Sequence, residues 1–364
     1  MRTQRSTRAG TAALVTLALG SALGLAACGS SDNDNDASGS AGDTKAGKVV
    51  TIATHDSWAM SKKVMAEFTR QTGITVKIQP HGDAGELTNK LVLTKDNPLA
   101  DGVFGIDNTF ASRAVDEGVL EKYDAHQPAS ATSFALDGDA SHYLTPIDYG
   151  DVCINIDDTW FAKHHVAPPK SFDDLADPAY KDLLVAPGAT SSSPGLAFLV
   201  ATIGTYGDGW KDYWQKLVDN GIKIDAGWTD AYEVDFTAGG GNGDRPIVVS
   251  YSSSPPFTVP KGSDKPTTSA LLDTCFRQVE YAGVLDGADN AKGAQEFIDF
   301  MLGKQFQAAL PDNMYVYPVD TSIALPTGWK TWAPTSPDPV DVSADDITEH
   351  RSEWLRDWRD ITSR

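Results

Sequence analysis

Apolar and polar residues along the first part of the chain follow two alternating periods. Residues 49–54 form a short run rich in β-branched side chains, which is typical of a strand, whereas residues 59–71 place apolar side chains at helical spacing. Further strand-like runs occur at 74–78 and 103–106, and a helical stretch follows each of them. Three strand–helix repeats within about 70 residues predict a parallel sheet with right-handed crossovers.

Ligands of such sheets bind beyond the carboxyl ends of the strands, where helices begin. This rule directs attention to three predicted loops at 54–58, 81–85 and 107–109. Asp83, with Glu86 three residues later, predicts the start of a helix. Asn108 or Thr109 is the expected cap of the helix that follows the third strand.

A second α/β set follows, with predicted strands at 152–156, 183–185, 223–224 and 247–251. Ser193 is the expected cap of a helix whose first turn holds Pro194. One amphipathic helix is predicted over residues 291–306 and another at the C-terminus. Two α/β sets indicate two lobes, and the strands that cross between them are expected near 143–156 and 275–284, side by side.

The N-terminal segment has the features of an export signal. Three arginines precede an apolar stretch over residues 11–27, and small residues lead to Cys28. The pattern resembles a bacterial lipoprotein signal, in which the cysteine carries the lipid; an ordinary signal peptide with a chance cysteine is the alternative. Residues 1–27 are therefore the predicted lipoprotein signal peptide. Residues 28–47 are the predicted flexible tether, because no large apolar residue follows Cys28 there.

Two cysteines remain after the lipid-bearing one, Cys153 and Cys275. An even remainder in an exported chain suggests a disulfide bond. Two buried free thiols are the alternative. The expected side-by-side crossing strands favour the bridge, since they would bring the two residues together.

Composition excludes several classes of function. The 364 residues are 41% hydrophobic and 22% charged, which is typical of a globular protein, and 30 basic against 50 acidic residues give a net charge of −20. This charge repels phosphate backbones, so nucleic-acid binding is not expected. The seven histidines show no His-Glu-x-x-His spacing, and no Gly-x-Ser-x-Gly motif occurs. We therefore expect no catalytic centre, no metal site and no cofactor.

Aromatic residues gather at predicted strand ends and loop tips, which suits a binding site; packing within the core is the alternative for each. They are Trp58, Trp228, Tyr232, Tyr251, Phe257, Tyr315 and Tyr317. Aromatic faces attract cations, and the carboxylates of Asp56 and Asp83 could offset a positive charge. Ser192 and Ser193, at a helix start, could hold an anion. A flat, cationic ligand with a phosphate or hydroxyl tail would satisfy all three features.

Eight segments of the chain resemble the thiamine-binding proteins of bacterial ABC importers, in the same order. They lie at 54–58, 100–108, 146–151, 191–196, 227–232, 250–255, 317–319 and 351–358. The resemblance implies a periplasmic-binding-protein-like type II α/β fold, with two α/β lobes joined by hinge strands. Residues 48–148 with about 277–316 would form lobe 1, and residues 149–276 with about 317–364 would form lobe 2.

Carried over position by position, the resemblance implies a set of ligand-binding residues, to which Asp56 is added for its charge. The set is His55, Asp56, Asp83, Ala84, Ser192, Ser193, Trp228, Tyr251, Phe257 and Tyr315. Three positions depart from the family pattern. His55 and Phe257 stand where relatives have Tyr, and Tyr315 stands where they usually have Trp.

The implied function is a monomeric, lipid-anchored receptor on the extracytoplasmic face of the cell membrane, attached only through its lipid. It would capture thiamine, thiamine monophosphate or thiamine diphosphate and deliver it to an ABC permease, without enzymatic activity. The same fold with ferric iron, a polyamine or a phosphonate as cargo is an alternative. An exported hydrolase and a surface adhesion or sensory lipoprotein without cargo are further alternatives.

Overall fold

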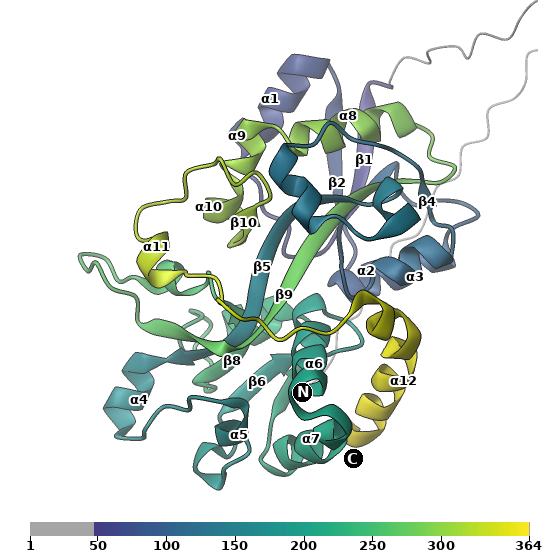
Figure 1. The fold of residues 1–364 in the computed structure, drawn as a ribbon. Coiled ribbons are helices and arrows are strands. Elements are labelled where there is room, and N and C mark those ends of the chain that lie inside the picture. Colours follow the sequence, from purple (N-terminus) through teal and green to yellow (C-terminus); the bar gives the residue numbers. More distant parts are fainter. Residues whose placement is uncertain (1–46, 364) are drawn as a thin grey trace, which may run out of the picture. The chain divides into compact units, whose positions relative to one another are not determined.

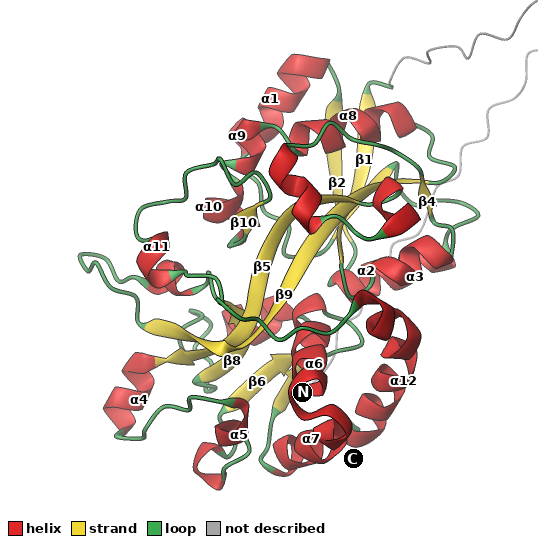
Figure 2. Ribbon diagram, viewed as in Figure 1, coloured by secondary structure: helices red, strands yellow, loops and turns green. Residues whose placement is uncertain are grey.

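A computed structural model describes residues 47–363 of the chain (Figure 1). Within these residues, ten strands form one mixed sheet with the order β2-β1-β3-β9-β5-β8-β6-β7, while β10 pairs with β5 and β4 pairs with β9. Helices pack against both faces of the sheet (Figure 2). The predicted signal peptide, the predicted lipid-attachment residue Cys28 and all of the predicted tether except residue 47 lie outside the described residues.

The first lobe alternates strands with helices, as the sequence predicts. Its elements are β1 (Val49–Thr54), α1 (Lys62–Thr72), β2 (Thr75–Pro80), α2 (Ala84–Leu93), β3 (Gly102–Asp107), α3 (Ala111–Asp116) and β4 (Leu120–Glu121). Strand β1 is central and runs parallel to both β2 and β3, so the carboxyl ends of all three strands lie at one edge of the sheet.

Local hydrogen bonds fix where these helices begin. The side chain of Asp83 accepts from the backbone N–H of Ala84 at 2.7 Å and caps α2, which confirms the prediction. The predicted cap of the next helix is wrong. Phe110 is the N-cap of α3 and makes no side-chain capping bond. The Asn108 side chain bonds to the backbone of the neighbouring strand β9, and the N–H groups of Thr109 and Phe110 donate to Asp107 at 2.9 and 3.0 Å.

The second lobe has the same kind of alternation. Its elements are α4 (Asp158–His164), α5 (Phe172–Leu175), β6 (Leu184–Pro187), α6 (Ser193–Tyr206), α7 (Trp210–Asp219), β7 (Lys223–Asp225), a π-helical turn (Asp230–Asp235) and β8 (Ile247–Tyr251). Ser192 caps α6, with its hydroxyl accepting from Gly195 N–H at 3.5 Å. The predicted cap, Ser193, is wrong by one residue, because proline is tolerated within the first turn of a helix and Pro194 is the second residue of α6.

Two long strands cross between the lobes, where the sequence predicts them. They are β5 (Thr145–Asp157) and β9 (Thr268–Leu285), which pair with each other in antiparallel orientation. Strand β9 also pairs with β3 of the first lobe, and β5 also pairs with β8 of the second. Figure 1 shows both strands running from one lobe into the other. Each is therefore a hinge strand.

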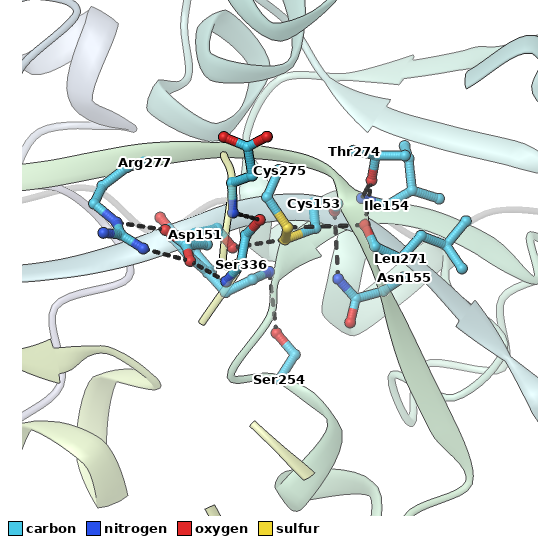
Figure 3. The surroundings of a disulfide bond; sticks show 12 residues. Asp151, Cys153, Ile154, Asn155, Ser254, Leu271, Thr274, Cys275, Arg277 and Ser336 are labelled. Atoms are coloured by element: carbon cyan, nitrogen blue, oxygen red, sulfur yellow. Dashed lines mark hydrogen bonds and ion pairs between the residues drawn. A yellow bond between two sulfur atoms is a disulfide. The ribbon is translucent and has the colours of Figure 1, made fainter. Parts of the chain in front are cut away.

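A disulfide bond joins Cys153 of β5 to Cys275 of β9, 122 residues apart in the chain (Figure 3). The bond lies where the pairing register of the two strands shifts, between Val152 and Ile154. Asp151, two residues from Cys153, accepts two hydrogen bonds from the Arg277 guanidinium, at 2.8 and 2.9 Å. The hinge strands are thus joined by backbone bonds, a covalent bridge and an ion pair.

The rest of the chain returns over both lobes. Its elements are α8 (Ala291–Met301), α9 (Lys304–Gln307), α10 (Leu310–Met314), β10 (Tyr317–Pro318), α11 (Trp329–Trp332) and α12 (Ala344–Thr362). The predicted single helix over 291–306 is wrong: the chain leaves the helix after Met301, and Gly303 takes an extended backbone conformation before α9 begins. The predicted C-terminal helix is confirmed as α12, whose Trp358 packs edge-on against Trp214 of α7.

The first lobe has its own buried core, in which Ile52, Phe104 and Phe297 pack together. Val316 and Val319 belong to the same core, so the chain stays with the first lobe for a few residues past position 317. The division of the chain into lobes at that position remains a prediction. Within residues 47–363, no helix combines the length and the apolar character that a bilayer-spanning segment requires.

Candidate ligand-binding site

A cavity of about 350 Å³ lies between the two lobes. It opens beyond the carboxyl ends of strands from both lobes, as expected for an α/β sheet. Its walls are formed by His55, Asp56, Ser57, Trp58, Ala59, Asp83, Ser193, Pro194, Trp228, Thr229, Glu233, Tyr251, Glu280, Asn313, Met314, Tyr315 and Val316. A volume of this size suits a small organic ligand.

Aromatic rings form one side of the cavity. Trp228 stacks on Tyr232, with ring centroids 4.9 Å apart, and meets Tyr315 edge-on at 6.0 Å. The indole N–H of Trp228 donates to Ser250 Oγ at 2.9 Å, which fixes the ring orientation. Tyr315 is held from behind by Phe257, which stacks on it at 3.4 Å. Two flat, braced rings therefore face the cavity at a right angle to each other.

Carboxylate side chains also line the cavity. Asp56 accepts from Gly82 N–H at 2.9 Å, and Asp83 accepts from the backbone N–H of Trp228 at 3.0 Å. Glu233 reaches the cavity from the π-helical turn, and Glu280 reaches it from hinge strand β9. His55 is the one basic side chain among the lining residues, all of which the structure describes. The ionisable side chains of the wall are thus predominantly acidic.

A buried ion pair forms part of the cavity wall. His55 Nε2 is 3.2 Å from Glu280 Oε1, and both side chains are almost fully buried. Burial opposes charge on His55, but the carboxylate of Glu280, together with those of Asp83 and Asp56, raises the histidine pKa above its usual value. Burial likewise disfavours ionised Glu280, yet the charge of His55 lowers its pKa. Burial, together with the charge of the neighbouring Glu280, raises the pKa of Asp148 well above its usual value.

The lobes touch each other at the mouth of the cavity. Besides the Asp83 contact with Trp228, the carbonyl of Ser191 accepts from the N–H groups of Gly85 and Glu86 at 3.0 and 3.2 Å. A side chain at Gly85 would not fit, since its Cβ would lie 2.8 Å from the Thr190 carbonyl oxygen. The structure thus has the lobes in contact across the site.

A family model described as bacterial extracellular solute-binding protein matches residues 97–334, more than half of the chain. The chain belongs to this family.

Similar proteins support the match over most of the chain. The thiamine-binding periplasmic protein of Salmonella typhimurium is 26% identical over 321 residues, which cover 87% of this chain and 94% of the relative. The protein of the same name from Brucella suis is 29% identical over 325 residues, covering 86% and 92%. A solved structure of a periplasmic thiamin binding protein superimposes with a TM-score of 0.76 at 25% identity, covering 87% of this chain and 96% of that one. These similarities confirm the predicted type II fold and the predicted resemblance to thiamine-binding proteins. The relatives are binding proteins rather than enzymes.

The structure brings most of the predicted binding residues of this solute-binding protein to the cavity. Those that line it are His55, Asp56, Asp83, Ser193, Trp228, Tyr251 and Tyr315. Three others do not. Ala84 is buried within α2, Ser192 is fully buried and engaged as a helix cap, and Phe257 lies behind Tyr315. Whether any of them contacts a ligand remains a prediction.

Two acidic lining residues were not predicted. Glu280 interrupts an otherwise apolar stretch of a hinge strand, and such a charge is a signal that sequence reasoning could have used. Glu233 directly follows Tyr232, in a segment from which only the aromatic residues Trp228 and Tyr232 were predicted to bind a ligand. Across the described part of the chain, no group of three or more His, Cys, Asp or Glu side chains is arranged to hold a metal ion.

Proposed function

We propose that this solute-binding protein captures thiamine outside the cytoplasm and delivers it to an ABC permease. The observation that carries the proposal is the cavity between the lobes, whose wall combines braced aromatic rings with carboxylates. Thiamine joins a flat aminopyrimidine to a thiazolium of fixed positive charge. Rings suit the flat parts, and cation–π attraction adds about 0.5–2 kcal/mol for each well-placed ring.

The same chemistry separates thiamine from the alternative cargoes. Ferric iron requires converging oxygen ligands, whereas Tyr232 and Tyr315 are stacked on neighbouring rings and Tyr317 donates to the carbonyl of Ala333. A phosphonate requires cationic partners, which the acidic wall does not supply. A polyamine is the second candidate, because the carboxylates of the cavity would also suit a chain of ammonium groups.

A fluorescence titration tests the proposal, since Trp58 and Trp228 line the cavity and report on its occupation. Thiamine, spermidine, ferric iron and 2-aminoethylphosphonate are added separately to the protein. We expect saturable binding of thiamine with one ligand per chain. Saturation by spermidine, iron or the phosphonate, with no response to thiamine, would contradict the proposal.

The proposed location is the extracytoplasmic face of the cell membrane, with the lipid on Cys28 as the attachment. Cys28→Ala removes the acceptor of the lipid and leaves the cavity unchanged, so the variant should be released into the soluble fraction with full affinity for thiamine. Fractionation and titration of the two proteins check this. A variant that stays with the membrane would show that another feature attaches the chain.

We further propose that the protein acts as a monomer whose lobes close on the ligand. The contacts of Asp83 and Ser191 across the mouth exist only when the lobes meet, so a ligand touching both lobes favours that state. Small-angle X-ray scattering should give the mass of one chain and a smaller radius of gyration with thiamine than without it. An unchanged radius at saturation would argue against closure.

A further inference from the structure

We propose that Glu233 is the residue of the cavity that attracts the positive charge of the ligand, so that the site selects a ring of fixed positive charge over a neutral ring of the same shape. This inference rests on the proposed function and deepens it, because it assigns the selection to one side chain. Four carboxylates line the cavity, those of Asp56, Asp83, Glu233 and Glu280. They differ in the partners that the protein already gives them.

Two of the four carboxylates are engaged by other groups of the cavity wall. Glu280 Oε1 lies 3.2 Å from His55 Nε2, so its charge is matched within the protein. Asp83 uses both of its oxygens: Oδ1 accepts from the N–H of Ala84 at 2.7 Å, and Oδ2 accepts from the N–H of Trp228 at 3.0 Å. Neither carboxylate is free to turn toward a ligand.

Asp56 is engaged on the first lobe. Its backbone N–H donates to the carbonyl of Gly82 at 2.8 Å, and its Oδ1 accepts from the N–H of Gly82 at 2.9 Å. This reciprocal pair ties the loop after β1 to the loop after β2. The carboxylate of Asp56 thus has a structural partner.

Glu233, in contrast, has no partner of this kind. Its side chain lines the cavity and is exposed. Two basic residues occur in the same segment of the chain, but Lys223 pairs with Asp235 and Arg245 pairs with Asp244. Among the residues that the structure describes, Glu233 forms no ion pair and no side-chain hydrogen bond. Its charge is therefore available to a ligand.

Glu233 also stands beside the aromatic rings of the cavity. It directly follows Tyr232, whose ring stacks on Trp228 with centroids 4.9 Å apart. Burial and the charge of Glu233 together raise the pKa of Tyr315, the ring that meets Trp228 edge-on. A cationic ring that lies against Trp228 or Tyr315 is therefore attracted by the aromatic face and by the carboxylate at once.

The position of Glu233 is fixed by the glycine-rich segment 239–243. A Cβ at Gly239 would lie 1.7 Å from the carbonyl oxygen of Tyr232, and a Cβ at Gly241 would lie 2.6 Å from that of Glu233. The backbone of this segment therefore packs directly on the π-helical turn that carries Glu233, and a side chain at either glycine would displace it. Turns of this kind are frequent at functional sites.

Isothermal titration calorimetry with thiamine and with a neutral analogue, in which a thiophene ring replaces the thiazolium, tests the inference. We expect wild-type protein to prefer thiamine roughly tenfold, and the preference should narrow at high salt because Glu233 is exposed. Equal affinity for the two compounds would overturn the selection and leave the proposed function in place. No binding of thiamine would instead contradict the proposed function itself.

Glu233→Gln keeps the shape of the side chain and removes its charge. We expect thiamine to bind roughly threefold to fivefold more weakly to this variant and the neutral analogue to bind as it does to wild type. A change that only disturbed the turn would weaken both compounds alike. An unchanged preference for thiamine, or an equal loss for the two compounds, would overturn the role of Glu233.

Asp230→Asn is the matched control, because Asp230 is an exposed acid of the same turn and is not among the residues that line the cavity. This variant should keep most of the preference for thiamine. A loss as large as that of Glu233→Gln would show that the overall negative charge of the turn, rather than Glu233, attracts the ligand. Asp56→Asn tests the competing carboxylate, and a larger loss of preference there than in Glu233→Gln would overturn the assignment.

Discussion

The two lobes meet at the hinge and at the cleft. The carboxylate at the hinge is paired with a cation, whereas most carboxylates at the cleft are not. At the hinge, the fully buried carboxylate of Asp151 is matched by the Arg277 guanidinium and also accepts from Ser336 N–H at 2.7 Å (Figure 3). At the cleft, Asp56, Asp83 and Glu233 line a cavity that has no Arg or Lys among its described lining residues.

The difference indicates which contacts depend on a ligand. A buried charge with its partner is satisfied in every state of the molecule, and the disulfide bond beside it keeps the hinge strands together. Carboxylates without a cation repel each other when the lobes meet, so a cationic ligand removes a cost of closure. We therefore expect changes at the hinge to alter stability, and changes at the cleft to alter affinity.

The largest expected effect is at the hinge. Replacing Cys153 and Cys275 with Ala removes a covalent bridge across 122 residues, and the free energy of unfolding should fall by about 4 kcal/mol. Urea unfolding of the variant and the parent measures the loss, and thiamine titration should show little change in affinity. In the Cys28→Ala background, the denatured and unreduced chain should contain no thiol that reacts with a labelling reagent. Two reactive thiols would contradict the bridge.

A smaller effect concerns Asp107, a buried carboxylate at the end of β3. Burial raises its pKa to about 6 from 3.8, against the opposing hydrogen bonds of neighbouring hydroxyl groups. Because the pKa is higher in the folded state, the stabilisation is complete below pH 3.8 and is lost as pH rises through 6. Asp107→Asn should therefore gain roughly 2 kcal/mol relative to wild type between pH 4 and pH 7. Urea unfolding at both pH values measures this gain, and a difference independent of pH would contradict it.

Closure can be blocked at Gly85, where the backbones of the two lobes are in contact. In Gly85→Ala, the new methyl group would lie 2.8 Å from the Thr190 carbonyl and 2.9 Å from the Phe110 ring. Overpacking of this kind costs about 1–3 kcal/mol, so affinity for thiamine should fall roughly 5- to 150-fold. Gly209→Ala, at the start of α7, has room for its methyl group and is the matched control. Equal affinities of the two variants would show that the mouth contacts do not contribute to binding.

The order of strands and helices could be predicted from the sequence, because the spacing of apolar residues and the runs of β-branched residues depend only on neighbouring positions in the chain. The hinge strands followed from the two α/β sets, and their pairing in turn favoured the bridge between Cys153 and Cys275. Helix starts were less predictable where several polar residues compete. Ser192 and Ser193 are adjacent, and the choice between them depends on the backbone conformation that each takes.

The composition of the site was harder to predict because it depends on contacts between distant segments. His55 and Glu280 are far apart in the chain, and their ion pair exists only because β9 crosses next to β3 in the first lobe. The same holds for Phe257, which was expected to contact the ligand. Its ring stacks on Tyr315, a contact that only the packing of the two segments reveals, and its contact with a ligand stays a prediction.

The most direct measurement of the central claim is calorimetric titration of thiamine into wild-type protein and the variants Trp228→Ala and Tyr315→Ala. Each variant removes one ring from the cavity wall, at an expected cost of about 1–2 kcal/mol or roughly tenfold in affinity. Trp160→Ala is the control, because Trp160 stacks on His164 away from the cavity. We predict that wild type and the control bind one thiamine per chain with similar affinity and that both cavity variants bind it more weakly. Undiminished binding in both cavity variants would contradict the claim that thiamine occupies this cavity.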